Sequence, residues 1–181
     1  MSETQTDEHG RTEPPVDGDE AATLLGFLRY QRETLAWKTS GLDADQLARS
    51  LPPTSMTLGG MLKHLAYVED DWFQRWTLDR AHPEPWASVD WKADPDWEWH
   101  SAAGDDPEAL RALWRAATSR SDEAIATALA DGGLGRPAER AFADGGRVSL
   151  RWVLVHMVEE YARHNGHADL LREAIDGAVG E

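Results

Sequence analysis

Cysteine is absent from this chain of 181 residues. Its absence excludes disulfide bonds, thiolate ligands for a metal and a cysteine nucleophile. Any sulfur chemistry therefore needs a thiol that arrives as a second substrate. A chain without cysteine also fits a reducing compartment.

Basic residues are scarce: Lys and Arg number 18 against 33 Asp and Glu, and the formal net charge is −15. Because nucleic acids are bound largely through Lys and Arg, this balance argues against a DNA or RNA partner. It argues equally against an anionic membrane surface. No apolar run approaches the roughly 18 residues of a membrane span, and the N-terminus lacks the apolar core of a signal peptide. We expect a cytoplasmic protein that handles a small molecule.

Apolar side chains are also rare at the N-terminus, where residues 1–18 hold only Met1 and Val16 among charges, prolines and glycines. Such a segment buries too little apolar surface to offset the entropy that is lost on ordering. We predict a disordered acidic tail over residues 1–18. The remaining residues, 19–181, are enough for one domain with a sizeable core.

Four segments show the periodicity of amphipathic helices. The third opens with Asp106-Pro107-Glu108, an N-cap followed by a proline at the first helical position, and Ser149 is the expected N-cap of the fourth. The predicted helices cover residues 20–40, 57–79, 106–129 and 149–175. They predict an all-α fold, a four-helix bundle with long crossover loops.

Two connections are longer than the roughly two to eight residues usual in a bundle. Residues 81–106 hold four tryptophans among acids and prolines; we interpret this loop as packed on the helices, with a pocket wall, a lid or a dimer contact as alternatives. Residues 131–148 are compatible with a short hairpin around Asp144-Gly145-Gly146. The other tryptophans have helical spacing and are expected in the core: Trp37, Trp72, Trp76, Trp114 and Trp152.

The most informative segment is the last helix, where ionisable residues interrupt an apolar stripe. An unpaired buried carboxylate costs several kcal/mol, roughly, or takes up a proton. A bound cation would compensate, and Glu160 and His164, spaced i and i+4, can converge on one metal. At about 100° per residue, the stripe consists of Val153, Met157, Glu160, His164, Ala168, Leu171 and Ile175.

A third ligand is expected from another helix, and the candidate is His64, at the margin of the apolar face of the second helix. Two histidines and one carboxylate hold zinc with an open position, and also Fe(II); nickel and manganese are alternatives. Alone, a histidine such as His64 is more often an ordinary half-buried side chain. A helical Glu-x-x-x-His pair is often a solvated salt bridge. The position of Glu160 and His164 within an apolar stripe favours ligation.

Other ionisable residues lie near these three. His156 flanks the stripe, and we interpret it as making local hydrogen bonds. His167, about one turn beyond His164, is the better candidate for orienting a ligand or contacting a substrate. Asp71 and Arg75 continue the face of His64, and a salt bridge between them is expected.

The residues described above resemble a known family. His64, followed far downstream by Glu160 and His164 in EEYARHNGHADLLREAIDG, is similar to the DinB-like (YfiT-like) superfamily of metal-dependent four-helix bundles. The nearest branch is that of mycothiol-dependent maleylpyruvate isomerase and related mycothiol transferases. The resemblance covers about residues 19–178 and includes TLGGMLKHLAYVEDDWF, WKADPDWEW and RVSLRWVLVHMVEEYARHNGHADLLRE. Many members carry a third histidine where this chain, like the isomerase, has Glu160.

The resemblance implies an up-down-down-up bundle, often a homodimer, with His64, Glu160 and His164 as metal ligands. His167 stands where many members have glutamine beside the site, and we assign it a catalytic role as a proton shuttle. The implied function is a metal-dependent transferase or isomerase. It would use zinc, or nickel, iron or manganese, and a low-molecular-weight thiol such as mycothiol against a small electrophile. A metal-dependent hydrolase, a non-catalytic metal or small-molecule binding protein and an oligomerising scaffold are the alternatives.

Overall fold

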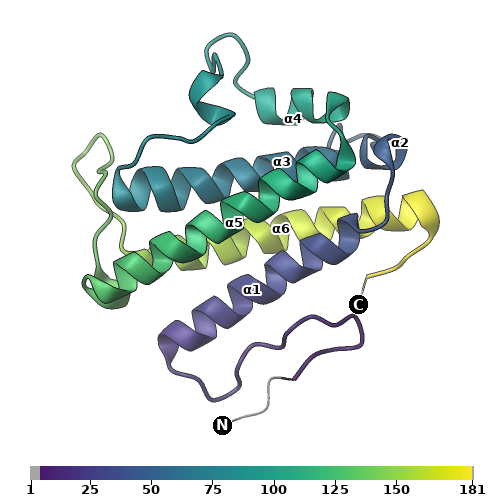
Figure 1. Cartoon of the computed structure of the whole chain (residues 1–181). Coiled ribbons are helices and arrows are strands. Elements are labelled where there is room, and N and C mark those ends of the chain that lie inside the picture. The colour runs from purple at the N-terminus through teal and green to yellow at the C-terminus, as the bar shows by residue number, and fades with distance from the viewer. Residues whose placement is uncertain (1–4, 181) are drawn as a thin grey trace. The chain divides into compact units, whose positions relative to one another are not determined.

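The four predicted helices are present in the computed structural model, which describes residues 5–180. They are α1 (Glu20–Thr39), α3 (Leu58–Glu69) with the π-helical η1 (Asp70–Thr77), α5 (Pro107–Ala130) and α6 (Leu150–Asp176) (Figure 1). Short elements that the sequence did not signal lie between them: α2 (Ala44–Leu47), η2 (Trp86–Ser88), α4 (Trp97–Ser101), η3 (Ala102–Gly104) and η4 (Gly133–Gly135). Residues 5–180 contain isolated β-bridges but no strand, so the all-α prediction is confirmed.

Each long helix begins where a side chain accepts hydrogen bonds from its first turn. The carboxylate of Asp19 accepts from the N–H of Ala22 at 2.8 Å, and that of Asp106 accepts from two N–H groups of α5. The hydroxyl of Thr57 caps α3, and that of Ser149 accepts from the N–H of Trp152 at 3.3 Å. These groups satisfy donors that the helix itself leaves unpaired. The N-caps predicted from the sequence, Asp106 and Ser149, are therefore confirmed.

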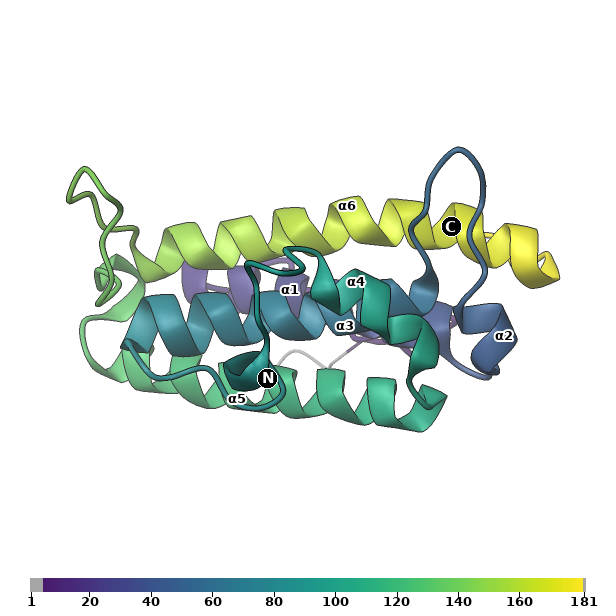
Figure 2. The same ribbon diagram turned by 90° about the horizontal axis from the view of Figure 1, so that it is seen from above.

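The described residues form two compact units, one made of the segments up to Gly41 and from Leu154 onward, the other of Leu42–Val153. In the first unit α1 and α6 run side by side (Figures 1 and 2). The amide of Asn165 donates to the carbonyl of Gln31 at 2.9 Å, and the ammonium of Lys38 pairs with Asp169 at 2.7 Å. The residue numbers of the contacting pairs increase in the same direction along both helices, so α1 and α6 are parallel.

In the second unit α3 and η1 run beside α5 in the same direction. The amide of Gln74 donates to the carbonyl of Arg120 at 2.6 Å, and the ammonium of Lys63 pairs with Asp105 at 2.5 Å. An up-down-down-up order requires the first and fourth helices to be parallel, and the second and third likewise. Both pairs are parallel here.

Asp70 fastens three elements of the second unit together. Its carboxylate is fully buried and accepts two hydrogen bonds from the guanidinium of Arg120 on α5, at 2.9 and 2.8 Å. It also accepts from the indole N–H of Trp86 in the long loop, at 2.8 Å. The guanidinium of Arg120 is charged, and hydrogen bonds between a guanidinium and a carboxylate are among the stronger ones in proteins. Asp70 thereby holds the 81–106 loop and α5 against the start of η1.

The tryptophans are distributed differently from the prediction. Trp114 is in the core at 7% exposure, but Trp152 is 44% exposed. The other three on the long helices, Trp37, Trp72 and Trp76, are half-buried. The most buried indole, Trp86 at 1%, belongs to the loop. The periodicity places a side chain on a helix face but does not reveal which loop will cover that face, so the core assignment was wrong for Trp152.

Two further segments bear on the predictions. Residues 131–148 make a turn in which the N–H of Phe142 donates to the carbonyl of Gly146 at 2.8 Å, without strands.

Residues 5–18 lie along α1, where the guanidinium of Arg11 is buried and donates to the hydroxyl of Thr34 at 2.9 Å. Disorder over residues 1–18 and a single domain over 19–181 stay predictions, and residues 1–4 lie outside the described part. Among residues 5–180, no helix is long and apolar enough to cross a membrane.

Candidate functional site

The stripe predicted on the last helix exists on α6. Val153, Met157 and Ala168 have no exposed surface. Within this stripe the side chain of His164 is 10% exposed and that of Glu160 is 27% exposed. The helix therefore brings a carboxylate and an imidazole together in largely apolar surroundings, as its sequence predicts.

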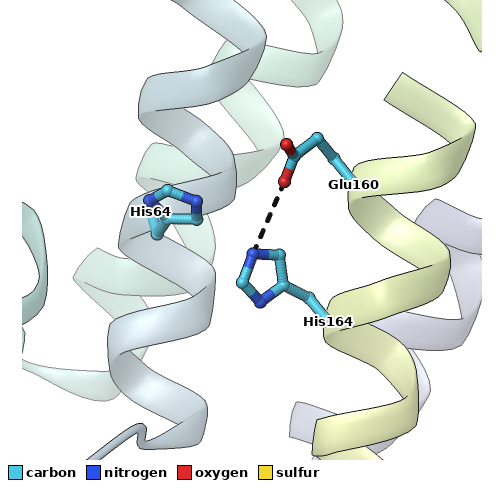
Figure 3. Close-up of side chains that lie close together, drawn as sticks. All are labelled: His64, Glu160 and His164. Atoms are coloured by element: carbon cyan, nitrogen blue, oxygen red, sulfur yellow. Dashed lines mark ion pairs between the residues drawn. The ribbon is translucent and has the colours of Figure 1, made fainter. Parts of the chain in front are cut away.

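The carboxylate of Glu160 faces a histidine one turn away on either side. Its Oε2 lies 3.6 Å from Nε2 of His164 (Figure 3), and its Oε1 lies 3.6 Å from Nε2 of His156. Both separations exceed the length of a hydrogen bond. Two ligands bound to zinc at about 2.0–2.1 Å with tetrahedral geometry are about 3.4 Å apart, so the spacing of Glu160 and His164 suits a shared cation.

The two flanking histidines differ in their surroundings. His156 is 20% exposed and also lies 3.5 Å from the carboxylate of Glu159, so it is close to two acids of its own helix. His167 lies next to His164, with the ring centroids 6.0 Å apart. Its Nδ1 is a buried nitrogen for which the described residues provide no hydrogen-bond partner.

His64 lies on α3, in the second unit (Figure 3). Its Nδ1 is 3.0 Å from Oε1 of Glu98, which belongs to α4, and its ring stacks on the indole of Trp99 with centroids 4.7 Å apart. Glu98 is 5% exposed and its Oε2 has no hydrogen-bond partner among the described residues. Ligation of one metal by His64 together with Glu160 and His164 stays a prediction.

The sequence alone did not single out Glu98. It stands in the WKADPDWEW segment, which was interpreted as packing or a pocket wall. No local signal distinguished Glu98 from the other acids of this segment, since Asp90, Asp94 and Asp96 are half-buried or exposed.

A second polar group follows His64 along the same helix. The carboxylate of Asp71 pairs with Arg75 at 2.6 Å, which confirms the predicted salt bridge, and with Nε2 of His82 at 2.9 Å. Burial alone would raise the pKa of Asp71, but the hydrogen bonds from His82 and Arg75 outweigh it, so the pKa lies below the usual 3.8. Burial, reinforced by the charge of Asp71, raises the pKa of Tyr67 to about 12. Tyr67 therefore keeps its proton at neutral pH.

The comparisons with known proteins identify the family. No curated protein sequence matches the chain. A family model described as mycothiol-S-transferase matches residues 23–177, which contain the long helices, apart from the first three residues of α1, and every candidate residue named above. The match agrees with the resemblance drawn from the His64, Glu160 and His164 motifs. With most of its length covered, this chain belongs to the mycothiol-S-transferase family.

Proposed function

We propose that this protein transfers the sulfur of a mycothiol-type thiol to a small electrophilic molecule, with a divalent metal held by His64, Glu160 and His164. The family match supports the thiol chemistry. The Glu160–His164 pair on α6 carries the metal part of the proposal, because its 3.6 Å separation within an apolar stripe suits a cation between the two groups. The absence of cysteine supports a thiol that comes from a cosubstrate.

The chemistry of the donors favours zinc. Each of the three residues offers one ligand atom, an imidazole nitrogen or a carboxylate oxygen. Such a set leaves an open position on zinc, and it also suits iron, while nickel and manganese are less usual choices. When bound, a divalent ion supplies positive charge that lowers the pKa of a thiol at the site toward neutrality.

The residues of the chain then handle the proton. As the thiol attacks, its S–H bond breaks and a bond forms between sulfur and the electrophilic carbon. We assign the proton to Nδ1 of His167, which lies buried without a partner among residues 5–180. The leaving group departs with its bonding electrons, and the proton passes from His167 to a basic leaving group or, when the leaving group is chloride, to water; the products are the thioether, the leaving group and one proton. A positioned acid–base group of this kind contributes about 10²–10⁴ in rate.

The test is a conjugation assay in which mycothiol and a chlorinated aromatic electrophile are incubated with the metal-loaded protein. The expected product is the thioether, and His167→Gln should lower kcat by about 10²-fold or more while the metal content is unchanged. His100→Gln is the control, since His100 pairs with Asp94 at 2.9 Å and its side chain is 66% exposed. Full activity in His167→Gln would contradict the assigned proton transfer.

The same assay separates the alternatives. Hydrolysis of esters or amides without thiol would favour a metal hydrolase. A saturable rise in melting temperature with thiol, without product, would favour a binding protein. Sedimentation of the same sample tests the homodimer that the resemblance implies.

A further inference from the structure

We infer that Glu98 is a positioning residue of the proposed metal site: it fixes the imidazole of His64 in the tautomer and orientation that leave Nε2 to bind the ion. The inference rests on the proposed function for the identity of the ligand. Its structural basis, however, lies wholly within the second unit, in the contacts between α4 and α3.

The hydrogen bond between Glu98 and His64 determines the tautomer. Oε1 of Glu98 lies 3.0 Å from Nδ1 of His64. A carboxylate oxygen is an acceptor, so this contact favours the tautomer of His64 in which Nδ1 donates. In a neutral imidazole the other nitrogen, Nε2, then keeps its lone pair, which is the form that a metal requires. Metal-binding histidines usually donate their second nitrogen to a carboxylate or carbonyl in this way.

The ring plane of His64 is fixed as well. The indole of Trp99 stacks on it, with centroids 4.7 Å and planes 27° apart. This stacking depends on Gly60, one turn earlier on α3, because a Cβ there would lie 2.6 Å from a ring carbon of Trp99. The ammonium of Lys63 lies 4.2 Å from the centre of the Trp97 ring and adds a second attachment of α4 to α3. These contacts hold α4 against α3 and so keep Glu98 beside His64.

The burial of Glu98 argues against a purely structural role. Its side chain is 6% exposed and Oε2 has no hydrogen-bond partner among the described residues. A buried carboxylate with an unsatisfied oxygen destabilises the fold, and glutamine or an apolar residue would fill the space at lower cost. A cation on Nε2 of His64 would offset this charge through the imidazole. The carboxylate is thus better explained by a bound ion than by packing.

The test compares Glu98→Gln and Glu98→Ala with Asp94→Ala. Asp94 is a matched control, because it belongs to the same loop and pairs with a histidine, His100, at 2.9 Å, but that histidine is 66% exposed and is not a proposed ligand. Zinc affinity is measured by competition with a chelator. The tautomer of His64 in the metal-free protein is read from nitrogen chemical shifts in NMR, with His64→Gln identifying the signal. The melting temperature of each metal-free variant is recorded.

Glu98→Ala should bind zinc about 10–100-fold more weakly than the wild type, with Asp94→Ala within twofold. Glu98→Gln should fall between them, because its amide oxygen can still accept a hydrogen bond from Nδ1 of His64. His64 should carry its proton on Nδ1 in the wild type and lose that preference in Glu98→Ala. The metal-free melting temperature of Glu98→Gln should not fall, whereas a purely structural role of the carboxylate predicts a lower one. If the wild type binds zinc and Glu98→Ala binds it within twofold, the inference is overturned while the proposed function stands. If the wild type binds no divalent metal, the proposed function fails and the inference with it.

Discussion

Replacing Asp70 with asparagine tests whether one buried carboxylate fastens the long loop and α5 to η1. The carboxylate accepts three hydrogen bonds, two from Arg120 and one from the indole of Trp86, and is fully buried. Asparagine has nearly the same shape but carries no charge, and its amide nitrogen is a donor. One of the three donors would then face another donor, and the guanidinium would lose its counter-charge.

The expected size of the effect follows from burial. Breaking a buried ion pair costs about 3–5 kcal/mol. The side chain of Arg120 is 32% exposed, so water recovers part of the loss and the lower end of that range applies. A loss of about 3 kcal/mol lowers the melting temperature by about 6–12 °C in a protein of this size. The matched change is Asp79→Asn, because Asp79 also pairs with an arginine, Arg140 at 2.7 Å, but is 58% exposed. An exposed pair contributes about 0–1 kcal/mol.

The assay is urea unfolding followed by tryptophan fluorescence and circular dichroism, with both variants on the same day. Arg120→Ala and the double variant complete a thermodynamic cycle, and the two substitutions should not be additive because the side chains share the same hydrogen bonds. If Asp70→Asn and Asp79→Asn both lowered the free energy of unfolding by less than about 1 kcal/mol, the reasoning on Asp70 would be refuted.

Three further results are expected. Gly60→Ala should lower the free energy of unfolding, measured in urea, by about 1–3 kcal/mol, because its Cβ would lie 2.6 Å from a ring carbon of Trp99. Gly104→Ala should leave it unchanged, because no heavy atom lies within 4 Å of a Cβ at that position. The pKa of Asp71 in the folded protein lies below 3.8, so its ion pairs stabilise the fold above about pH 4 and this stabilisation is lost as the pH falls through that pKa. In Asp71→Asn the melting temperature should therefore fall less steeply with decreasing pH in the acid range than in the wild type. Tyr67→Phe should remove from the ultraviolet titration a phenolate signal with a midpoint near pH 12, and a midpoint near 10 would contradict the burial argument.

The long helices could be predicted from the sequence because their information is local. The cap residues Asp106 and Ser149 and the spacing of Glu160 and His164 depend only on helix geometry, which is the same in every helix. The structure agrees with these predictions to within a few residues at each end. The family could be predicted because its motifs are continuous stretches of sequence, such as the one on α6 that holds Glu160 and His164.

The loop contacts could not be predicted in this way. Glu98 meets His64 from 34 positions away, and the indole of Trp86 meets Asp70 from 16 positions away. Neither contact has a periodic signal, because the path of the loop determines it. The widening of α3 into the π-helical η1 also depends on packing, and π-helical segments occur frequently at functional sites. Exposure of Trp152 has the same origin, since no loop covers that part of α6 among the described residues.

The central claim is that His64, Glu160 and His164 bind one divalent metal. It is tested most directly by the metal content of tag-free protein, measured by mass spectrometry for the wild type, Glu160→Gln, His164→Ala and the control Glu159→Gln, which removes a carboxylate on the same helix that is 59% exposed. We predict about one zinc or other divalent ion per chain in the wild type and the control, and a loss of the ion in the two ligand variants. No metal in the wild type, or the same metal content in all four proteins, would contradict the claim.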